Sequence, residues 1–338
     1  MEYRKISDTD LELPVITFGA WAAGGWMWGR TERKDAVEAI RASYNLGVTA
    51  IDTAPVYGQG ESEEIVGEAI KGLDRSKIQV LTKYGMRWDL DSPKGDFAFK
   101  SKTNDGEEID IYRYAGAESI IKECENSLRR LGTDYIDLYQ IHWPDTTTPI
   151  AETMEAVTRL VKDGKVRHAG VCNYNVSQMK EAEKSISLVS NQIPFSMVKR
   201  DIEKEVVPHC IANNKAILAY SPLERGLLTG KMKPGYSFQE GDHRASLYFF
   251  SDENIRRTNS FLQKIKPLAD EKKVTLSQLV LRWTLTKPGI TIALVGARNA
   301  AQAVSNAKAG DLRLTQSEMD VINNHLNELE IVKPAPVA

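Results

Sequence analysis

The chain has 338 residues, a formal net charge of −2 and 27% charged residues, a balance that gives no overall positive field for nucleic acid or an anionic membrane surface. No apolar stretch approaches the ~18 residues of a membrane-spanning helix, and the N-terminus has no apolar signal core. The three cysteines, Cys124, Cys172 and Cys210, form no paired motif, and an odd number argues against a disulfide framework. We therefore expect a cytoplasmic protein whose partners include neither nucleic acid nor a membrane.

Short β-rich apolar runs alternate with longer segments of helical periodicity, which predicts a parallel sheet with crossover helices. Eight runs have strand length, at residues 16–20, 48–52, 78–82, 135–141, 166–172, 188–192, 217–221 and 291–295. The predicted helices between and after them cover residues 31–46, 62–70, 117–131, 150–162, 177–184, 203–213 and 300–307. This repeat favours an α/β fold of the closed (β/α)8 kind, a TIM barrel, and barrels of this length commonly form a single domain, here 1–338.

Two predicted elements lie outside the repeat. Residues 3–6 and 12–15 predict a short hairpin that closes the floor of the barrel, and helical spacing at residues 315–329 predicts a C-terminal helix. Two long connections, residues 84–116 and 223–252, follow the third and the seventh predicted strand. Because long connections usually carry function, and barrel enzymes keep their active sites at the C-terminal rim, we expect both connections beside the active site.

Four ionisable residues cluster at the ends of the second, third and fourth predicted strands, where a barrel would bring them to one rim: Asp52, Tyr57, Lys83 and His142. In carbonyl reduction, a hydride arriving at carbon builds negative charge on oxygen, which requires a proton and hydrogen-bond donors. We expect Tyr57 to give the proton, and Lys83 to lower the pKa of that phenol from about 10 toward neutrality. Asp52 would keep Lys83 charged, and His142 would donate to the carbonyl oxygen or relay protons. Each residue alone also fits a packing, turn or surface role, so the prediction depends on their joint position.

Several motifs around these residues, in the same order along the chain, resemble the aldo-keto reductase superfamily. The matching segments are residues 47–54 leading to Tyr57 and Gly58, residues 128–143, and residues 164–173. The resemblance covers nearly the whole chain, from Gly19 to Asn306. It implies a (β/α)8 barrel, catalysis by the tetrad named above, and reduction of aldehydes and ketones by hydride transfer from NADPH.

The expected cofactor site is not one of the common glycine-rich nucleotide loops, because neither GxGxxG nor GxxxxGK[ST] occurs. A better anion site begins where a predicted strand ends in Gly296 and Arg298 opens a helix, since helix N-termini attract anions. Arg298 can hold a 2′-phosphate through paired hydrogen bonds, and Gln302 and Asn306 share one helical face. This segment also resembles the family's adenosine-binding motif, which implies NADP rather than NAD; a helix cap with a solvated arginine is the alternative.

The resemblance implies further cofactor contacts along the rim. The segment that begins at Tyr220 and Ser221 resembles the family's strand-seven segment around the pyrophosphate. Phe195 stands where the family usually has a tyrosine that stacks on the nicotinamide, and amides at two strand ends match those that bind its carboxamide. The predicted cofactor contacts are Trp21, Asp52, Asn173, Gln192, Phe195, Ser221, Pro222, Leu223, Gly226, Leu228, Lys231, Arg244, Gly296, Arg298, Gln302 and Asn306.

The tryptophans available for a pocket rim favour apolar or aromatic carbonyl substrates, although core packing also explains some of them. These residues are Trp21, Trp26, Trp28, Trp88 and Trp143. The sequence predicts neither the particular substrate nor the oligomeric state.

Two other classes of protein fit part of the pattern. A regulatory subunit that binds NADP(H) and a protein partner, as potassium-channel β subunits of the same superfamily do, would keep the tetrad; the short segment before Tyr3 favours the enzyme. A metal-dependent hydrolase or isomerase using Asp52 and His142 would need a ligand spacing such as HExxH or HxH. Neither spacing occurs, so we expect no metal site.

Overall fold

The barrel predicted from the repeat is present in the computed structural model, which describes residues 1–29, 31–239 and 241–334. Eight parallel strands close into one barrel, in which β13 pairs with β3 through Ala293 and Ile16. The strands are β3 (Ile16–Gly19), β4 (Ala50–Asp52), β5 (Gln79–Tyr84), β9 (Ile136–Ile141), β10 (Val166–Cys172), β11 (Leu188–Pro194), β12 (Ala216–Tyr220) and β13 (Ile290–Gly296). The expected (β/α)8 fold is confirmed.

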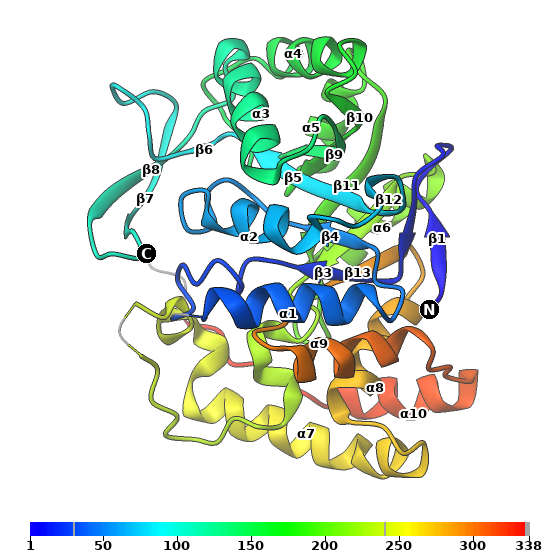
Figure 1. The fold of residues 1–338 in the computed structure, drawn as a ribbon. Coiled ribbons are helices and arrows are strands. Elements are labelled where there is room, and N and C mark those ends of the chain that lie inside the picture. The colour runs from blue at the N-terminus through cyan, green and yellow to red at the C-terminus, as the bar shows by residue number, and fades with distance from the viewer. Residues whose placement is uncertain (30, 240, 335–338) are drawn as a thin grey trace.

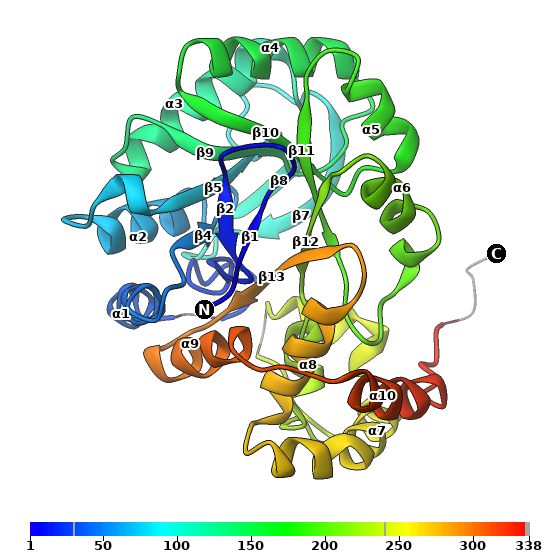
Figure 2. The same ribbon diagram turned by 90° about the vertical axis from the view of Figure 1, so that its right-hand side faces the viewer.

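Helices form a ring around the strands, which Figure 2 shows from the N-terminal side of the barrel. They are α1 (Arg33–Tyr44), α2 (Glu61–Ile70), α3 (Ala117–Leu131), α4 (Ile150–Lys162), α5 (Val176–Ala182), α6 (Val206–Ala212), α7 (Asp252–Glu271), α8 (Leu276–Thr286) and α9 (Ala300–Ala307). The sequence prediction missed α7 and α8. Helix α8 is buried on nearly all sides from Gln278 to Leu285, so it lacks the polar face that marks a surface helix, and α7 contains Pro267 in its interior.

The predicted hairpin and C-terminal helix are both present. Strands β1 (Tyr3–Lys5) and β2 (Glu12–Pro14) pair in antiparallel register and close the N-terminal end of the barrel, in front in Figure 2. Two apolar side chains of the hairpin region, Ile6 and Leu13, are buried inside the barrel. They belong to the same cluster as the barrel residues Leu81, Leu138 and Leu218. Helix α10 (Gln316–Asn327) begins with a capping box at Thr315 and packs against α7.

The two long connections lie at the other end of the barrel from the hairpin, as Figure 1 shows. Residues 84–116 contain a three-stranded antiparallel sheet of β6 (Met86–Arg87), β8 (Glu108–Arg113) and β7 (Asp96–Lys102). The second connection, yellow-green in Figure 1, contains the short 3-10 helices η3 (Glu224–Thr229), η4 (His243–Ser246) and η5 (Tyr248–Phe250). Both connections therefore stand on the C-terminal rim, where the candidate catalytic residues also lie.

Candidate active site

A cavity of about 810 Å³ opens on the C-terminal rim of the barrel. Most of the predicted site residues line it. Those brought together there are Trp21, Asp52, Tyr57, His142, Asn173, Gln192, Ser221, Pro222, Leu223, Gly226, Lys231, Arg244, Gly296, Arg298, Gln302 and Asn306. Lys83 is buried next to Asp52. The cavity thus connects the candidate proton donor with the candidate adenosine site.

Strand alternation explains why Asp52 and Lys83 meet. Ala50 and Leu81 lie in the cluster inside the barrel, so Asp52 and Lys83, two residues further along β4 and β5, point to the same side. The Lys83 ammonium donates to Asp52 Oδ1 at 2.6 Å and to the Thr53 carbonyl at 2.8 Å. Both side chains are buried, so the structure brings Asp52 and Lys83 together as a buried pair.

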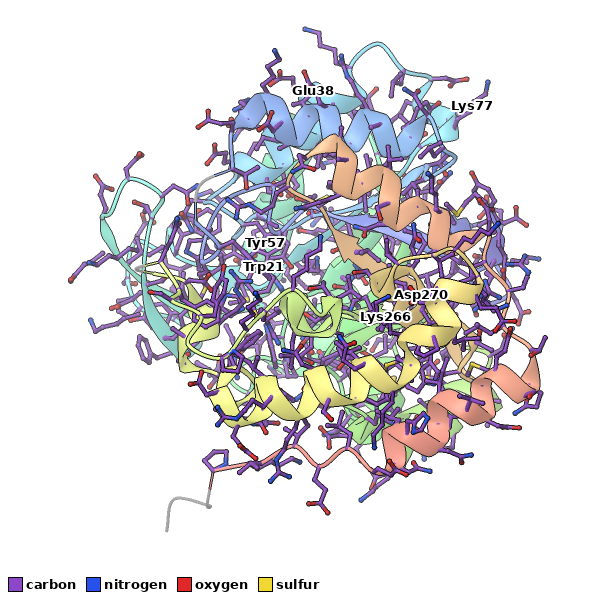
Figure 3. All side chains as sticks on the ribbon, turned by 90° about the horizontal axis from the view of Figure 1, so that it is seen from below. Trp21, Glu38, Tyr57, Lys77, Lys266 and Asp270 are labelled. Carbon is purple, nitrogen blue, oxygen red and sulfur yellow. The ribbon has the colours of Figure 1, made fainter. Side chains whose placement is uncertain are left out.

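Tyr57 and His142 complete the cluster above this ion pair. The Tyr57 hydroxyl lies 3.4 Å from His142 Nε2, and the Lys83 ammonium lies 4.9 Å from the centroid of the Tyr57 ring. On its other side the Tyr57 ring stacks on Trp21 with centroids 5.8 Å apart, and the two are neighbours in Figure 3. All four residues of the predicted tetrad are therefore adjacent, with the phenol facing the cavity.

The electrostatics of Tyr57 differ from the expectation. Burial raises the pKa of Tyr57 to about 12; the positive charge of Lys83 lowers it by less, and Asp52 opposes Lys83. The expected fall toward neutrality is wrong, because burial of the phenol outweighs the effect of the Lys83 charge on its pKa, and Asp52 opposes Lys83 as well. Burial works against the charge on Lys83, yet Asp52 and Tyr57 together raise its pKa, while burial and then Lys83 lower the pKa of His142. At neutral pH the phenol of Tyr57 is thus protonated, Lys83 is an ammonium and the His142 imidazole is neutral.

The two predicted amides hold parts of this cluster in place. Gln192 donates through Nε2 to Asp52 Oδ2 at 2.8 Å. Asn173 donates through Nδ2 to the His142 carbonyl at 3.0 Å, and its Oδ1 accepts the Tyr220 hydroxyl at 3.0 Å. Asn173 keeps one amide hydrogen and Gln192 its carbonyl oxygen for a further partner in the cavity, since each amide can make more bonds than these.

Two predicted cofactor contacts do not reach the cavity. Phe195 is buried and stacks on Trp283, with ring centroids 6.0 Å apart and planes within 5°. Leu228 is fully buried in the core around the barrel. The aromatic residue that lines the cavity beside Asn173 is Tyr220, which the prediction did not single out as a ring contact, although it directly precedes Ser221 and Pro222.

The connection after β12 forms a tight backbone turn along the cavity. Ser221, Glu224, Arg225 and Gly226 all have positive φ angles, and Arg225 lines the cavity although the prediction did not include it. Arg244 reaches the same wall, but its guanidinium already forms paired hydrogen bonds with Asp242, at 2.9 Å and 2.6 Å. The expected positive charge of Arg244 is therefore largely neutralised in place.

The far end of the cavity is formed by the start of α9. The Arg298 amide donates to Gln302 Oε1 at 2.9 Å, and Asn306 Nδ2 donates to the Gly296 carbonyl at 3.1 Å. Arg298 Nε donates to Thr31 Oγ1 at 3.1 Å, and Thr31 itself donates to the Ala22 carbonyl at 2.9 Å. The exposed guanidinium is thus held at the mouth of the cavity by the connection between β3 and α1.

The tetrad end of the cavity is mainly aromatic and apolar. Of the five tryptophans considered for the rim, four line the cavity, and Trp88 lies outside it. Other apolar side chains come from the β6–β8 sheet and from the turn before Tyr57. They are Val56, Met86 and Phe99. The sheet in the first long connection therefore contributes directly to the wall of the candidate substrate site.

Among the residues that the structure describes, no group of three His, Cys, Asp or Glu side chains is arranged to hold a metal ion. Over the same residues, no helix is both long and apolar enough to cross a bilayer. The three cysteines are free and buried.

Comparison with known proteins identifies the class that this barrel and tetrad define. The chain belongs to the Aldo/keto reductase family, which matches residues 15–327. It is 39% identical to the aldo-keto reductase YhdN of Bacillus subtilis over 96% of this chain and 94% of that protein. It is 34% identical to the NADH-specific methylglyoxal reductase of Escherichia coli over 96% of this chain and 98% of that protein.

Solved structures show the same fold. The glycerol dehydrogenase AKR11B4 of Gluconobacter oxydans superposes with a TM-score of 0.86 at 34% identity, over 99% of this chain and 98% of that one. An aldo/keto reductase of Klebsiella pneumoniae in complex with NADP and acetate superposes with a TM-score of 0.70 at 29% identity, over 95% of this chain and 96% of that one. The chain is thus a member of the aldo-keto reductase family, and its similarity to oxidoreductases of that family covers the whole barrel.

Proposed function

We propose that this protein is an NADP(H)-dependent reductase that converts aldehydes or ketones to alcohols, with Tyr57 as the general acid. The observation that carries the proposal is the buried Lys83–Asp52 ion pair directly beneath a phenol that faces the cavity. A structural tyrosine would not need a buried ammonium, which is costly to desolvate, held against its ring.

The residues around the cavity fit NADP(H). Neutral amides at Asn173 and Gln192 suit an uncharged nicotinamide head group, the turn at Ser221 to Gly226 presents backbone to the middle of the cavity, and Arg298 stands at its far end. The NADP complex of the Klebsiella pneumoniae relative supports this choice, whereas the Escherichia coli relative is named for NADH. Arg298 is the residue that favours the phosphorylated cofactor here.

In the proposed reaction, a reduced nicotinamide held by Asn173 and Gln192 would supply the hydride for the carbonyl carbon. Tyr57 transfers its hydroxyl proton to the oxygen as negative charge develops, and the Lys83 ammonium stabilises the phenolate that forms. His142, neutral and next to the Tyr57 hydroxyl, positions the carbonyl oxygen. Asp52 keeps Lys83 charged and oriented, and Gln192 orients Asp52.

The test is to follow oxidation of NADPH by its absorbance with a panel of aldehydes and ketones, together with NADPH binding by fluorescence. We expect turnover with several carbonyl compounds, and its loss in Tyr57→Phe with NADPH binding retained. Tyr3→Phe, an exposed tyrosine on the hairpin, is the matched control. Tight NADPH binding with no turnover of any carbonyl would instead favour a nucleotide-sensing regulatory subunit.

Because all three cysteines are free and buried, we place the enzyme in the reducing cytoplasm.

A further inference from the structure

A buried ion pair connects helix α3 with strand β6 and takes no part in the proposed reaction. Glu123 on α3 is 5% exposed and Arg87 on β6 is 3% exposed. Arg87 Nη1 lies 3.7 Å from Glu123 Oε1. The Ser119 hydroxyl links them, because it accepts from Arg87 and donates to Glu123 Oε1 at 3.2 Å. Burying two charges costs free energy that their attraction recovers only in part, so stability alone is a weak explanation for this pair.

The same carboxylate holds both chain neighbours of Met86. The Gly85 amide donates to Glu123 Oε2 at 3.0 Å, while Glu123 Oε1 faces Arg87. Gly85 has a φ angle of +83°, which residues with a side chain rarely adopt, and here the chain leaves β5 and enters β6. Glu123 therefore fixes the backbone immediately before and immediately after Met86.

The Met86 side chain is part of the wall of the candidate substrate site. It lines the cavity and belongs to one apolar cluster with Trp26 and Val56, against which Tyr57 packs. A methionine side chain is unbranched and flexible, so its own shape does not fix where it lies. The position of this wall beside the proton donor therefore depends on the backbone that Glu123 and Arg87 hold.

We propose that Glu123 and Arg87 are positioning residues for the substrate site: they hold Met86 against carbonyl compounds large enough to reach it, and so set the selectivity between bulky and small substrates. This inference rests on the proposed reductase function and goes beyond it. Neither Glu123 nor Arg87 lines the cavity, so both act through Met86.

The charge of Glu123 is the part of this arrangement that pH can change. Burial raises the pKa of Glu123 to about 7, against the opposing effect of Arg87. Above that pH the carboxylate attracts Arg87, and below it the neutral acid holds Arg87 more weakly. The other charged or titratable groups that act on Glu123 or respond to it are Arg87 and Asp89 on one side, Tyr84 from β5 and Tyr139 from β9. Burial raises the pKa of both phenols well above 10, so Glu123 changes its charge near neutral pH while these phenols do not.

The test compares KM for benzaldehyde, a bulky probe, with KM for propanal, a small one. Glu123→Gln keeps an oxygen that accepts from Gly85 and removes the charge. At about pH 8 it should raise KM for benzaldehyde by about three- to tenfold, the effect of weakening one charge-assisted hydrogen bond. KM for propanal, kcat and the dissociation constant of NADPH should stay unchanged, which a general loss of structure would not produce.

The pH profile of the wild type tests the same inference without a variant. Between about pH 8 and about pH 6, KM for benzaldehyde should rise toward the value of Glu123→Gln, because Glu123 becomes neutral. KM for propanal should not follow it. In Glu123→Gln, KM for benzaldehyde should be independent of pH over this range, since the titrating group is gone.

A double variant shows whether Glu123 acts through Met86. In a Met86→Ala protein, adding Glu123→Gln should not change KM for benzaldehyde further, because the side chain to be positioned is absent. Asp89→Asn is the matched control. It removes a half-exposed carboxylate 2.8 Å from Arg87 Nε and leaves Glu123 in place, so KM for benzaldehyde at about pH 8 should equal the wild-type value.

Several results would overturn the positioning role and leave the reductase function standing. They are a wild-type KM for benzaldehyde that does not change with pH, an equal rise for both aldehydes in Glu123→Gln, the same rise in the Met86→Ala background, and reduction of propanal but not of benzaldehyde. If the wild type reduces neither aldehyde nor any other carbonyl compound, the proposed function fails and the positioning role falls with it.

Discussion

The Lys83 ammonium lies 2.6 Å from Asp52 Oδ1, and both side chains are almost completely buried, at 1% and 5% exposure. Burying two charges costs free energy that their mutual attraction recovers only in part, and apolar replacements of such pairs are often more stable. The barrel has apolar side chains at the neighbouring inward positions Ala50 and Leu81. The next inward positions of β4 and β5 hold the charged pair Asp52 and Lys83 instead of apolar side chains. We explain this pair by its effect on Tyr57.

The first prediction separates the structural effect of this pair from its chemical effect. Lys83→Met should lower the unfolding free energy by about 3–5 kcal/mol, because Asp52 is left buried and unpaired. The double variant Lys83→Met with Asp52→Asn should recover most of that stability. Both variants should lose about 10²–10⁴-fold in kcat, since neither stabilises the Tyr57 phenolate. Denaturant unfolding and steady-state NADPH oxidation measure the two effects; a double variant with near wild-type kcat would refute the role of Lys83.

The second prediction concerns the pH dependence of hydride transfer. Tyr57 must be protonated to act as an acid in reduction, and burial raises its pKa to about 12, so the acid form persists through neutral pH. The pKa of His142 is lowered, so this ring stays neutral below its ordinary value of 6.5. We expect the single-turnover rate of reduction to stay flat between about pH 6 and pH 10. A decline with a midpoint near pH 7 would show that Lys83 does bring the phenol to neutrality.

The fold was predictable from the sequence where local pattern and tertiary role agree. Short apolar runs ending in a polar residue, such as the one that ends at Asp52, became barrel strands because both faces of those strands are buried. Helix α8 was missed for the converse reason: Trp283 and its neighbours are buried on all sides, so there is no periodicity to detect. The antiparallel sheet of β6, β7 and β8 was missed because β7 and β8 are only partly buried and lack the continuous apolar runs of the barrel strands, and β6 has only two residues.

The tetrad was predictable because each member lies at or shortly after the C-terminal end of a strand, and the ends of parallel strands in a barrel converge. Phe195 shows where this reasoning stops: it also follows a strand, β11, but its ring points outward onto Trp283 in α8. The direction of one side chain after a strand end depends on the local turn, which the pattern does not specify. The high pKa of Tyr57 was unpredictable for a related reason, since it depends on burial that the sequence does not show.

The third prediction tests the cofactor preference. Arg298→Ala should weaken NADPH binding by about 10–100-fold, the value of lost charge-assisted hydrogen bonds to a phosphate, with a much smaller effect on NADH. Thr31→Val removes the hydroxyl that accepts from Arg298 Nε and should weaken NADPH binding by a smaller factor in the same direction. Fluorescence titration with both cofactors measures each effect. Equal losses for NADPH and NADH in Arg298→Ala would refute a 2′-phosphate contact.

The fourth prediction concerns the end of the barrel opposite the active site. The Arg4 guanidinium on β1 donates to the carbonyls of Ile290 and Thr291 at 2.9 Å and 3.1 Å and to the Leu285 carbonyl at 3.1 Å. These hydrogen bonds connect the hairpin to the last turn of α8 and to the first two residues of β13. Arg4→Met keeps the apolar stem but leaves these partly buried carbonyls without their donor.

We therefore expect Arg4→Met to lower the unfolding free energy by about 1–3 kcal/mol, with a fall of several degrees in Tm. Because the hairpin and the cavity lie at opposite ends of the barrel, kcat and KM should match the wild type at a temperature well below Tm. Lys5→Met, on the same strand but exposed, is the control for removing a positive charge. An Arg4→Met protein with wild-type Tm would mean that the apolar side chains of the hairpin, such as Leu13 and Ile6 inside the barrel, hold it in place without these hydrogen bonds.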